Sequence, residues 1–259
     1  MSDKQKKFIK KIKQEKRFIL FMQISLTIIF LLTWELLSKY NIINSFIASS
    51  PSRILKTLSN LYLDGTLFYH IWVTLKEIII SFLLGSIIGF ILAILFYMIP
   101  IIKKIFDPFL TLINSLPKVS LGPLLIIWLG ANTSSIIVMS LLINTIVTLI
   151  SIYNGLNTTD KYKIKLFKTF KANKWQTLIY LVIPHNKEII ASSLKLNISM
   201  SLIGVIMGEF LVSKAGIGYL ILYGTQVFNL NLVMTGIFLI MIISFIIYEL
   251  INLLEKRTI

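Results

Sequence analysis

The sequence predicts an all-α membrane protein with six transmembrane helices. Of its 259 residues, 56% are hydrophobic and only 14% are charged, whereas soluble domains are about 45–50% apolar and about 25% charged. A helix needs about 20 apolar residues to cross a hydrocarbon layer, so this length allows roughly five to seven crossings. Apolar stretches long enough to span occur at residues 18–37, 71–99, 105–129, 134–153, 188–212 and 230–253.

The first predicted span follows a basic N-terminal segment, residues 1–17. We place this span at residues 18–38. A basic region before an apolar run also resembles a signal peptide, but this run is long, contains Trp34 and Glu35, and lacks a small-residue cleavage site close behind it. We therefore expect a retained transmembrane helix that begins in the cytoplasm.

The next segment, residues 39–67, is a mixture of polar and apolar residues and is predicted to lie outside the membrane. Ser50 followed by Pro51 is the pattern of a helix N-cap with proline in the first turn. The pattern predicts a short amphipathic helix at the outer surface, with its apolar residues at Ile54, Leu55, Leu58 and Leu61.

Residues 68–253 are predicted to form the membrane core, and residues 254–259 a cytoplasmic C-terminus. The third apolar stretch is interrupted by the sequence SLPKVSLGP at residues 115–123. Its two prolines and its glycine would break the hydrogen-bond ladder of a helix in mid-membrane. We therefore expect a discontinuous third span.

The basic residues predict the orientation, because cytoplasmic loops carry an excess of Lys and Arg. With the N-terminus inside, the outer segments hold four of the 26 basic residues: Lys39, Arg53, Lys56 and Lys214. The inner segments hold nineteen: Lys4, Lys6, Lys7, Lys10, Lys11, Lys13, Lys16, Arg17, Lys103, Lys104, Lys161, Lys163, Lys165, Lys168, Lys171, Lys174, Lys187, Lys256 and Arg257. Both termini are thus predicted to be cytoplasmic, in a multi-pass protein of the plasma or inner membrane. The basic excess then marks topology and not a nucleic-acid partner.

Several kinds of chemistry are absent from the sequence. It has no cysteine, which excludes a disulfide framework, a thiolate metal site and a cysteine nucleophile. The topology puts His70 and His185 on opposite sides, so we expect no metal site. The chain also lacks the glycine-rich loop that holds ATP phosphates. We expect no catalytic residue and no cofactor in this chain.

The long inner loop, residues 159–184, is predicted to form a helix-turn-helix under the membrane. Asp160 supplies a negative charge at the start of the first helix, and Asn173 with Gln176 has the spacing of a capping box for the second. The first helix has apolar residues on one face and lysines on the other. This pattern fits a membrane-surface helix that contacts anionic lipid, or a coupling element that inserts into a cytoplasmic partner.

The sequence Ala172–Thr177 together with Val182-Ile183-Pro184 resembles the cytoplasmic loop of binding-protein-dependent ABC importer permeases. That loop has a Glu-Ala-Ala triplet, which the register places at Lys165, Leu166 and Phe167. It also has a glycine, which falls at Lys171. Neither feature is matched in this sequence.

The rest of the chain resembles the nitrate/sulfonate/taurine-type branch of these permeases over about residues 46 to 253. The resemblance rests on ASSPS at 48–52, DGTL at 64–67, His70, TL at 74–75, Phe82, Gly85, Gly89, DP at 107–108, LP at 116–117, LGPLLIIWLG at 121–130, GEFL at 208–211 and GIGYLI at 216–221.

The resemblance implies a type I ABC importer permease fold, with six spans and cytoplasmic coupling helices. It also implies two ABC ATPase subunits that bind ATP and Mg²⁺, a second permease that is identical or different, and an extracytoplasmic solute-binding protein. The residues expected to couple to the ATPase are Asp160, Lys165, Leu166, Phe167, Phe170, Lys171, Ala172, Trp175 and Pro184.

Two groups of polar residues are candidates for the translocation pathway. Asn114, Ser115 and Lys118 lie at the broken span, where freed backbone groups could meet a polar solute. Lys118 would suit an anionic or organic solute, resembling a sulfonate, nitrate, taurine or a vitamin precursor. Alternatively it snorkels or pairs with Glu209 or Glu77.

The second group is a stripe on the fifth span. A polar stripe in hydrocarbon must face protein or water, so it forms a pathway wall or makes interhelical hydrogen bonds. The patterns Gly85-x-x-x-Gly89 and Gly204-x-x-x-Gly208 predict close helix packing, within the chain or at a dimer seam. The residues of the stripe are Ser193, Asn197, Ser201, Gly204 and Gly208, with Glu209 beside them.

Three rival functions would each need features of their own. A secondary transporter or channel would need coupling carboxylates in mid-membrane and an inverted repeat, and we find neither. A membrane-embedded enzyme would need clustered acids or histidines at one interface. An energy-coupling importer also has coupling helices, but the likeness at residues 208–221 favours the binding-protein-dependent type.

Overall fold

The computed structural model describes residues 3–43 and 48–258, and the segments predicted at 1–17, 39–67 and 254–259 each include residues outside these ranges. In the described residues, five helices are long and apolar enough to cross a membrane, and one bent pair adds a sixth. The five are α1 (Asp3–Lys39), α4 (Thr66–Met98), α7 (Thr133–Leu156), α11 (Lys187–Val212) and α13 (Leu230–Thr258). The predicted number and order of spans are confirmed.

The third span is broken, as the sequence predicts. It consists of α5 (Pro100–Ser115), a 3₁₀ turn η1 (Lys118–Leu121) and α6 (Gly122–Leu129), and its two arms meet at 91°. Leu116 has extended backbone angles, which the following Pro117 imposes by steric conflict with a helical conformation. The chain therefore leaves α5 at the first proline and turns before α6 begins.

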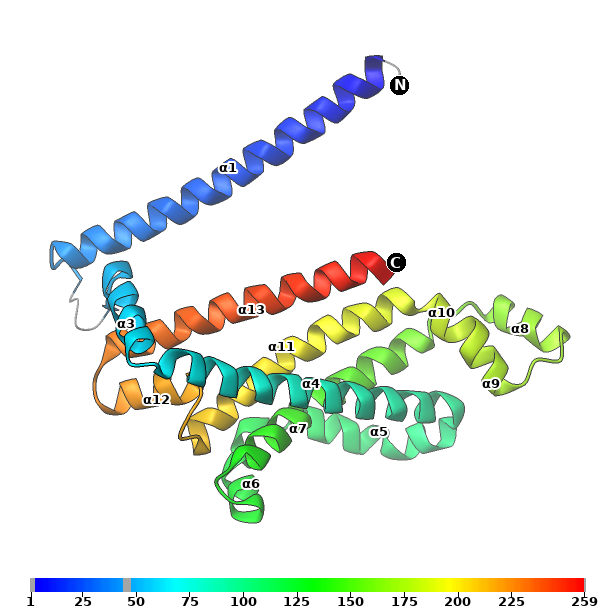
Figure 1. Cartoon of the computed structure of the whole chain (residues 1–259). Helices are drawn as coiled ribbons and strands as arrows, with labels where there is room; N and C mark the ends of the chain where they lie inside the picture. The colour runs from blue at the N-terminus through cyan, green and yellow to red at the C-terminus, as the bar shows by residue number, and fades with distance from the viewer. Residues whose placement is uncertain (1–2, 44–47, 259) are drawn as a thin grey trace.

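Helices α4, α7 and α11 form the core of the bundle (Figure 1). Their close approach depends on glycine: a Cβ atom at Gly204 would lie 2.5 Å from the Cα of Ser140, and one at Gly208 would lie 2.9 Å from the Cα of Ile136. Gly85 and Gly89 face α7 in the same way. Both glycine pairs therefore serve packing within the chain, the first of the two alternatives.

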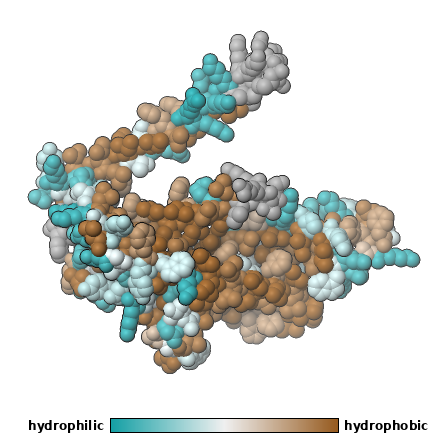
Figure 2. Space-filling model, in the orientation of Figure 1, coloured by the Kyte–Doolittle hydropathy of each residue, from teal (hydrophilic) through white to brown (hydrophobic). Residues whose placement is uncertain are grey.

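One end of the bundle carries two short helices, α3 (Pro51–Leu63) and α12 (Ile217–Gln226) (Figure 1). The Ser50 side chain accepts a hydrogen bond from the backbone N–H of Arg53, which confirms the predicted N-cap. Leu58 of α3 packs with Ile217 of α12 and with α13. Apolar surface covers the middle of the molecule and polar residues gather at its two ends (Figure 2), as expected for a protein with lipid around its centre.

Helix α1 is longer than the span predicted at 18–38 because it continues through the basic segment, where lysine and glutamine favour helix. It stands apart from the other spans along most of its length (Figure 1). Near its C-terminal end, the Glu35 carboxylate accepts hydrogen bonds from the Ser52 hydroxyl (2.7 Å) and backbone N–H (3.0 Å). These bonds connect α1 to α3.

Candidate functional site

Residues 159–184 fold into the predicted helix-turn-helix, α8 (Lys161–Thr169) followed by α9 (Lys174–Thr177). Asp160 Oδ1 accepts a hydrogen bond from the Tyr162 N–H at 2.8 Å and so caps α8. Asn173 and Gln176 exchange side-chain to backbone hydrogen bonds, each 2.8 Å long. The sequence-based interpretation of both helix starts is confirmed.

The turn between α8 and α9 has a left-handed residue at Lys171, with φ of +58°. This is the position at which the resemblance places a glycine. The N–H of Ala172 bonds back to the Phe167 carbonyl and that of Lys171 to the Lys168 carbonyl, so the turn closes α8. A lysine here retains the turn at a cost of roughly 1–2 kcal/mol, because its Cβ crowds the carbonyl oxygen.

Aromatic and basic side chains are exposed on this hairpin. Phe170 is 75% exposed and Trp175 is 58% exposed, and Tyr162 and Leu166 are also open to solvent. Phe167 and Ala172 are half-buried, while Lys165, Lys171 and Pro184 are exposed. Exposed aromatic residues among charged ones are typical of a protein-binding surface.

The hairpin is joined firmly to the bundle. Behind α9 the chain forms a π-helical turn, η2 (Leu178–Val182), and then α10 (Ile183–His185). Leu178 and Val182 are buried against Ala93 of α4 and against Ile152 and Leu156 of α7. The hairpin and the core therefore form one packed unit.

A side-chain amide clamps the two ends of the hairpin. Asn186 Nδ2 donates to Thr159 Oγ1 at 2.7 Å, and Asn186 Oδ1 accepts from Thr158 Oγ1 at 2.9 Å. Asn186 is buried. Sequence reasoning missed it, since the only local signal is a polar residue two positions after Pro184, where an apolar run ends.

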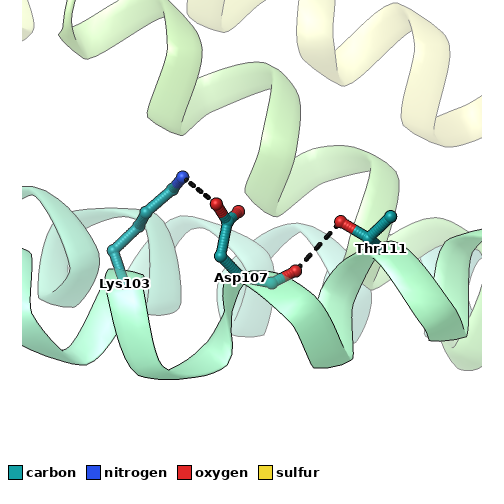
Figure 3. A network of polar contacts seen from close by, with 3 residues as sticks. All are labelled: Lys103, Asp107 and Thr111. Carbon is teal, nitrogen blue, oxygen red and sulfur yellow. Dashed lines mark hydrogen bonds and ion pairs between the residues drawn. The ribbon is translucent and has the colours of Figure 1, made fainter.

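A cavity of about 430 Å³ lies between α5 and α7. Five polar side chains of α5 line it, and all but the last follow one another at helical spacing: Lys103, Asp107, Thr111, Asn114 and Ser115. Lys103 Nζ lies 2.8 Å from Asp107 Oδ2, and the two side chains rise from the same face of the helix (Figure 3). Sequence reasoning singled out only the far end of this row, and the signal it missed was the i, i+4, i+8 spacing.

The predicted pathway residues of the broken span lie at the far end of this row. Asn114 and Ser115 line the cavity. Lys118 Nζ donates to the backbone oxygen of Asn114 at 3.1 Å, so it pairs with neither Glu77 nor Glu209, both of which are buried. The three residues stay candidates for contact with solute.

Two residues of the polar stripe of α11, Asn197 and Ser201, make hydrogen bonds to other helices. Asn197 Nδ2 donates to Ser86 Oγ of α4 at 2.7 Å, and Asn144 Nδ2 of α7 donates to Ser201 Oγ at 2.7 Å. Both Asn197 and Ser201 have no exposed surface. Of the two roles expected for the stripe, the structure therefore shows interhelical hydrogen bonds at Asn197 and Ser201. A role of the stripe in the wall of the translocation pathway stays a prediction.

Glu209 is likewise fully buried, and it holds the loop before α12. Its carboxylate accepts hydrogen bonds from the Thr74 hydroxyl and from the Gly218 N–H. The two preceding N–H groups donate to α4, Gly216 to His70 Nδ1 at 3.1 Å and Ile217 to Thr74 Oγ1 at 2.8 Å. Side chains therefore bind three successive N–H groups at the start of α12, those of its N-cap Gly216 and of its first two residues.

The glycine at the end of this loop, directly before α12, is required by the geometry of the loop. Gly216 has φ of +107°, and a Cβ atom there would lie 2.2 Å from Glu209 Oε1. The loop approaches the carboxylate closely only because it lacks a side chain at this point.

Comparison with known proteins identifies the family of this chain. The family model described as the binding-protein-dependent transport system inner membrane component matches residues 85–259. The chain belongs to this family. It is the transmembrane permease subunit of an ABC importer, as the sequence predicts.

Individual relatives agree with the family. The permease is 29% identical over 229 residues to an ABC transporter permease protein of Haemophilus influenzae, covering 88% of this chain and 93% of that one. It is 23% identical to an aliphatic sulfonates transport permease protein of Bacillus subtilis, over 93% of this chain and 88% of that one. It is also 23% identical to the taurine transport system permease protein of Escherichia coli, and this match covers 93% of this chain and 91% of that one.

The fold is that of type I importer permeases. A chain of the MetNI methionine ABC transporter, solved in inward-facing conformations, superimposes with a TM-score of 0.66 at 16% identity, covering 76% of the permease and 98% of that chain. These matches favour the importer over the rival secondary transporter, channel, membrane enzyme and energy-coupling scaffold.

Proposed function

We propose that the permease works as one of a pair, with an ABC ATPase subunit docked on each α8–α9 hairpin and a solute-binding protein at the outer face. The second permease is a copy of this chain or a different chain. ATP and Mg²⁺ are held by the ATPase subunits, and the permease itself carries out no catalysis. The observation that carries this proposal is the hairpin: exposed aromatic residues on a rigid protrusion at one end of the bundle.

The hairpin lies on the cytoplasmic side in this proposal, together with both termini. Two observations support that orientation. The predicted inner segments hold nineteen of the 26 basic residues. The N-terminal end of α1 and the C-terminal end of α13 both point toward the side of the bundle that carries α8 and α9 (Figure 1).

Movement of the ATPase reaches the membrane through packed contacts. Closure of the ATPase subunits on ATP would move the α8–α9 hairpins, and Leu178 and Val182 would pass this movement to α4 and α7. A packed interface moves as a rigid body and does not deform continuously. The difference between inward and outward opening then depends on contacts that the hairpin makes in only one state.

The solute would pass along the polar face of α5 toward the cytoplasm. Asn114, Ser115 and Lys118 stand where that face meets the break in the span, and the cavity extends from there to Lys103. A broken helix offers backbone groups to a polar solute in mid-membrane. We infer a small organic or anionic solute, in keeping with the sulfonates and taurine in the names of the relatives.

Replacement of Phe167 and Phe170 by Asp tests the docking surface. The double variant should lose the ATPase in a pull-down from membranes, because two charges would enter an apolar contact. Phe228→Asp is the matched control, since Phe228 is an exposed phenylalanine in the turn between α12 and α13; it should retain the ATPase. Retention of the ATPase by the double variant would refute the docking assignment, provided that all variants elute as folded monodisperse protein.

A further inference from the structure

We infer that the buried side chains of Glu77 on α4 and Glu209 on α11 hold one proton between them, and that Glu77 carries it. Among the side chains that the structure describes, these are the only buried acidic ones, with exposed fractions of 2% and 0%. Neither lines the cavity between α5 and α7. The proton-binding site is therefore separate from the proposed pathway, and the inference does not depend on the proposed function.

The two carboxyl groups are neighbours. Thr74 donates a hydrogen bond to Glu209, and Glu77 follows Thr74 by three residues on the same face of α4. The carboxyl group of Glu77 is within hydrogen-bond reach of that of Glu209 and of the Thr133 hydroxyl. Ionised carboxylates only accept hydrogen bonds, so contact between two of them without a proton is repulsive.

The hydrogen bonds show which of the two carboxyl groups is the anion. Glu209 accepts from the Gly218 N–H and from the Thr74 hydroxyl. Thr74 itself accepts from the Ile217 N–H, so its own hydrogen points to Glu209. Both oxygens of Glu209 are thus acceptors, as in an ionised carboxylate.

Glu77 is in the opposite situation. Its Oε2 atom is buried and has no hydrogen-bond partner, which is rare and unfavourable for a polar atom. A proton on this oxygen makes it a donor, and each oxygen of the Glu209 carboxylate can accept a second hydrogen bond. One proton therefore satisfies Glu77 and removes one of two negative charges whose joint burial would be expensive.

No cation near the pair replaces the proton. His70 accepts the Gly216 N–H at Nδ1, so its ring is uncharged. Lys76 and Lys214 are exposed, and neither forms an ion pair with the two glutamates in the described part of the chain. Helices α6, α7 and α12 contain no Asp, Glu, Lys, Arg or His. The charged residues of α11 and α13 lie toward the other end of the bundle (Figure 1).

The proton makes the stability of the bundle depend on pH. An exposed glutamate of the unfolded chain is ionised at neutral pH, whereas the folded chain keeps the proton on Glu77. Unfolding then releases a proton, so the free energy of unfolding should fall as the pH rises. Loss of the proton would place a second negative charge beside Glu209, which holds the start of α12.

Infrared spectroscopy tests for the proton directly. A protonated carboxylic acid has a C=O stretch at a higher frequency than any carboxylate or backbone amide. We expect this band at neutral pH in the full-length permease, purified in a detergent that lacks ester groups so that the region is clear. Glu77→Gln should abolish the band. Glu188→Gln, at an exposed glutamate of α11, should retain it.

Thermal unfolding at several pH values gives a second, independent test. Glutamine resembles a protonated glutamate, so Glu77→Gln should unfold at or above the temperature of the wild type. The difference should grow from about pH 6 to about pH 9. Glu209→Gln should unfold at a lower temperature over the whole range, because an amide has one accepting oxygen where the carboxylate has two. A pair with a purely structural role predicts a loss from both variants that does not change with pH.

Three results would overturn the inference: no protonated-carboxyl band in the wild type, a band that survives Glu77→Gln, or a Glu77→Gln variant that is misfolded or less stable than the wild type at every pH. Stabilisation by NaCl but not by choline chloride, without the band, would also overturn it, because Na⁺ would then fill the place of the proton. These measurements need neither the ATPase nor a solute. Their failure is therefore distinct from failure of the proposed import function, which the ATPase pull-down tests separately.

Discussion

The hydroxyl of Thr74 on α4 donates a 2.6 Å hydrogen bond to the carboxylate of Glu209 on α11, across 135 residues of sequence. The same hydroxyl accepts from the Ile217 N–H and the same carboxylate accepts from the Gly218 N–H. The two side chains together therefore hold the loop before α12 against the bundle.

Loss of the Glu209 carboxylate should loosen this loop. Glu209→Ala leaves the Thr74 hydroxyl and the Gly218 N–H without their buried acceptor. Each unsatisfied group costs about 1–3 kcal/mol of folding free energy. We expect a clear fall in the midpoint of thermal unfolding, measured by fluorescence-detected size-exclusion chromatography. Glu188→Ala, an exposed glutamate on the same helix, should leave the midpoint within error; equal effects would contradict the assigned role.

Glycine should stabilise the turn of the coupling hairpin. Lys171 has φ of +58°, so Lys171→Gly removes backbone strain of about 1 kcal/mol. Lys168→Gly, three residues earlier inside α8, should instead destabilise by about 1 kcal/mol because glycine is a poor helix former. The sign of each change is measurable as resistance of the hairpin to limited chymotrypsin digestion, because this protease cleaves after the aromatic residues of the hairpin, which both variants retain. A loss of resistance in Lys171→Gly would contradict the conformational argument.

The packing of α7 against α11 should not tolerate a methyl group at Gly204. Its Cβ would lie 2.5 Å from the Cα of Ser140, so the two helices must separate, at a cost of typically about 1–3 kcal/mol. Gly204→Ala should lower the yield of folded permease and its unfolding temperature. The control is Ser199→Ala at an exposed position of α11, which should resemble the wild type.

The clamp at Asn186 should hold the hairpin in place. Asn186→Ala removes the hydrogen bonds to Thr158 and Thr159, and a loss of about 2 kcal/mol would raise local opening roughly thirtyfold. Hydrogen–deuterium exchange of residues 159–184 should accelerate while α4 and α7 exchange as before. Asn157→Ala is a suitable comparison, because the Asn157 side chain bonds only to the Tyr153 carbonyl of its own helix; equal acceleration in both variants would rule out the clamp.

The sequence by itself determined the number of spans, the break in the third span and the starts of the short helices. These features depend on local chemistry. Apolar length decides a crossing, proline and glycine decide a break, and Ser50, Asp160 and Asn173 accept hydrogen bonds from N–H groups within three residues of themselves.

Only the tertiary structure decided which polar residues face a neighbouring helix and which face a cavity. Asn197 and Lys103 are both polar residues in membrane helices, yet one is buried against Ser86 and the other lines an open cavity beside Tyr153. The difference depends on how each helix is rotated and on which partner lies opposite. In the side-chain bonds that link α4, α7 and α11 to one another, or α4 to the start of α12, that partner is 57 to 146 residues away in the sequence. Helical periodicity places residues on a common face, but packing alone determines what that face meets.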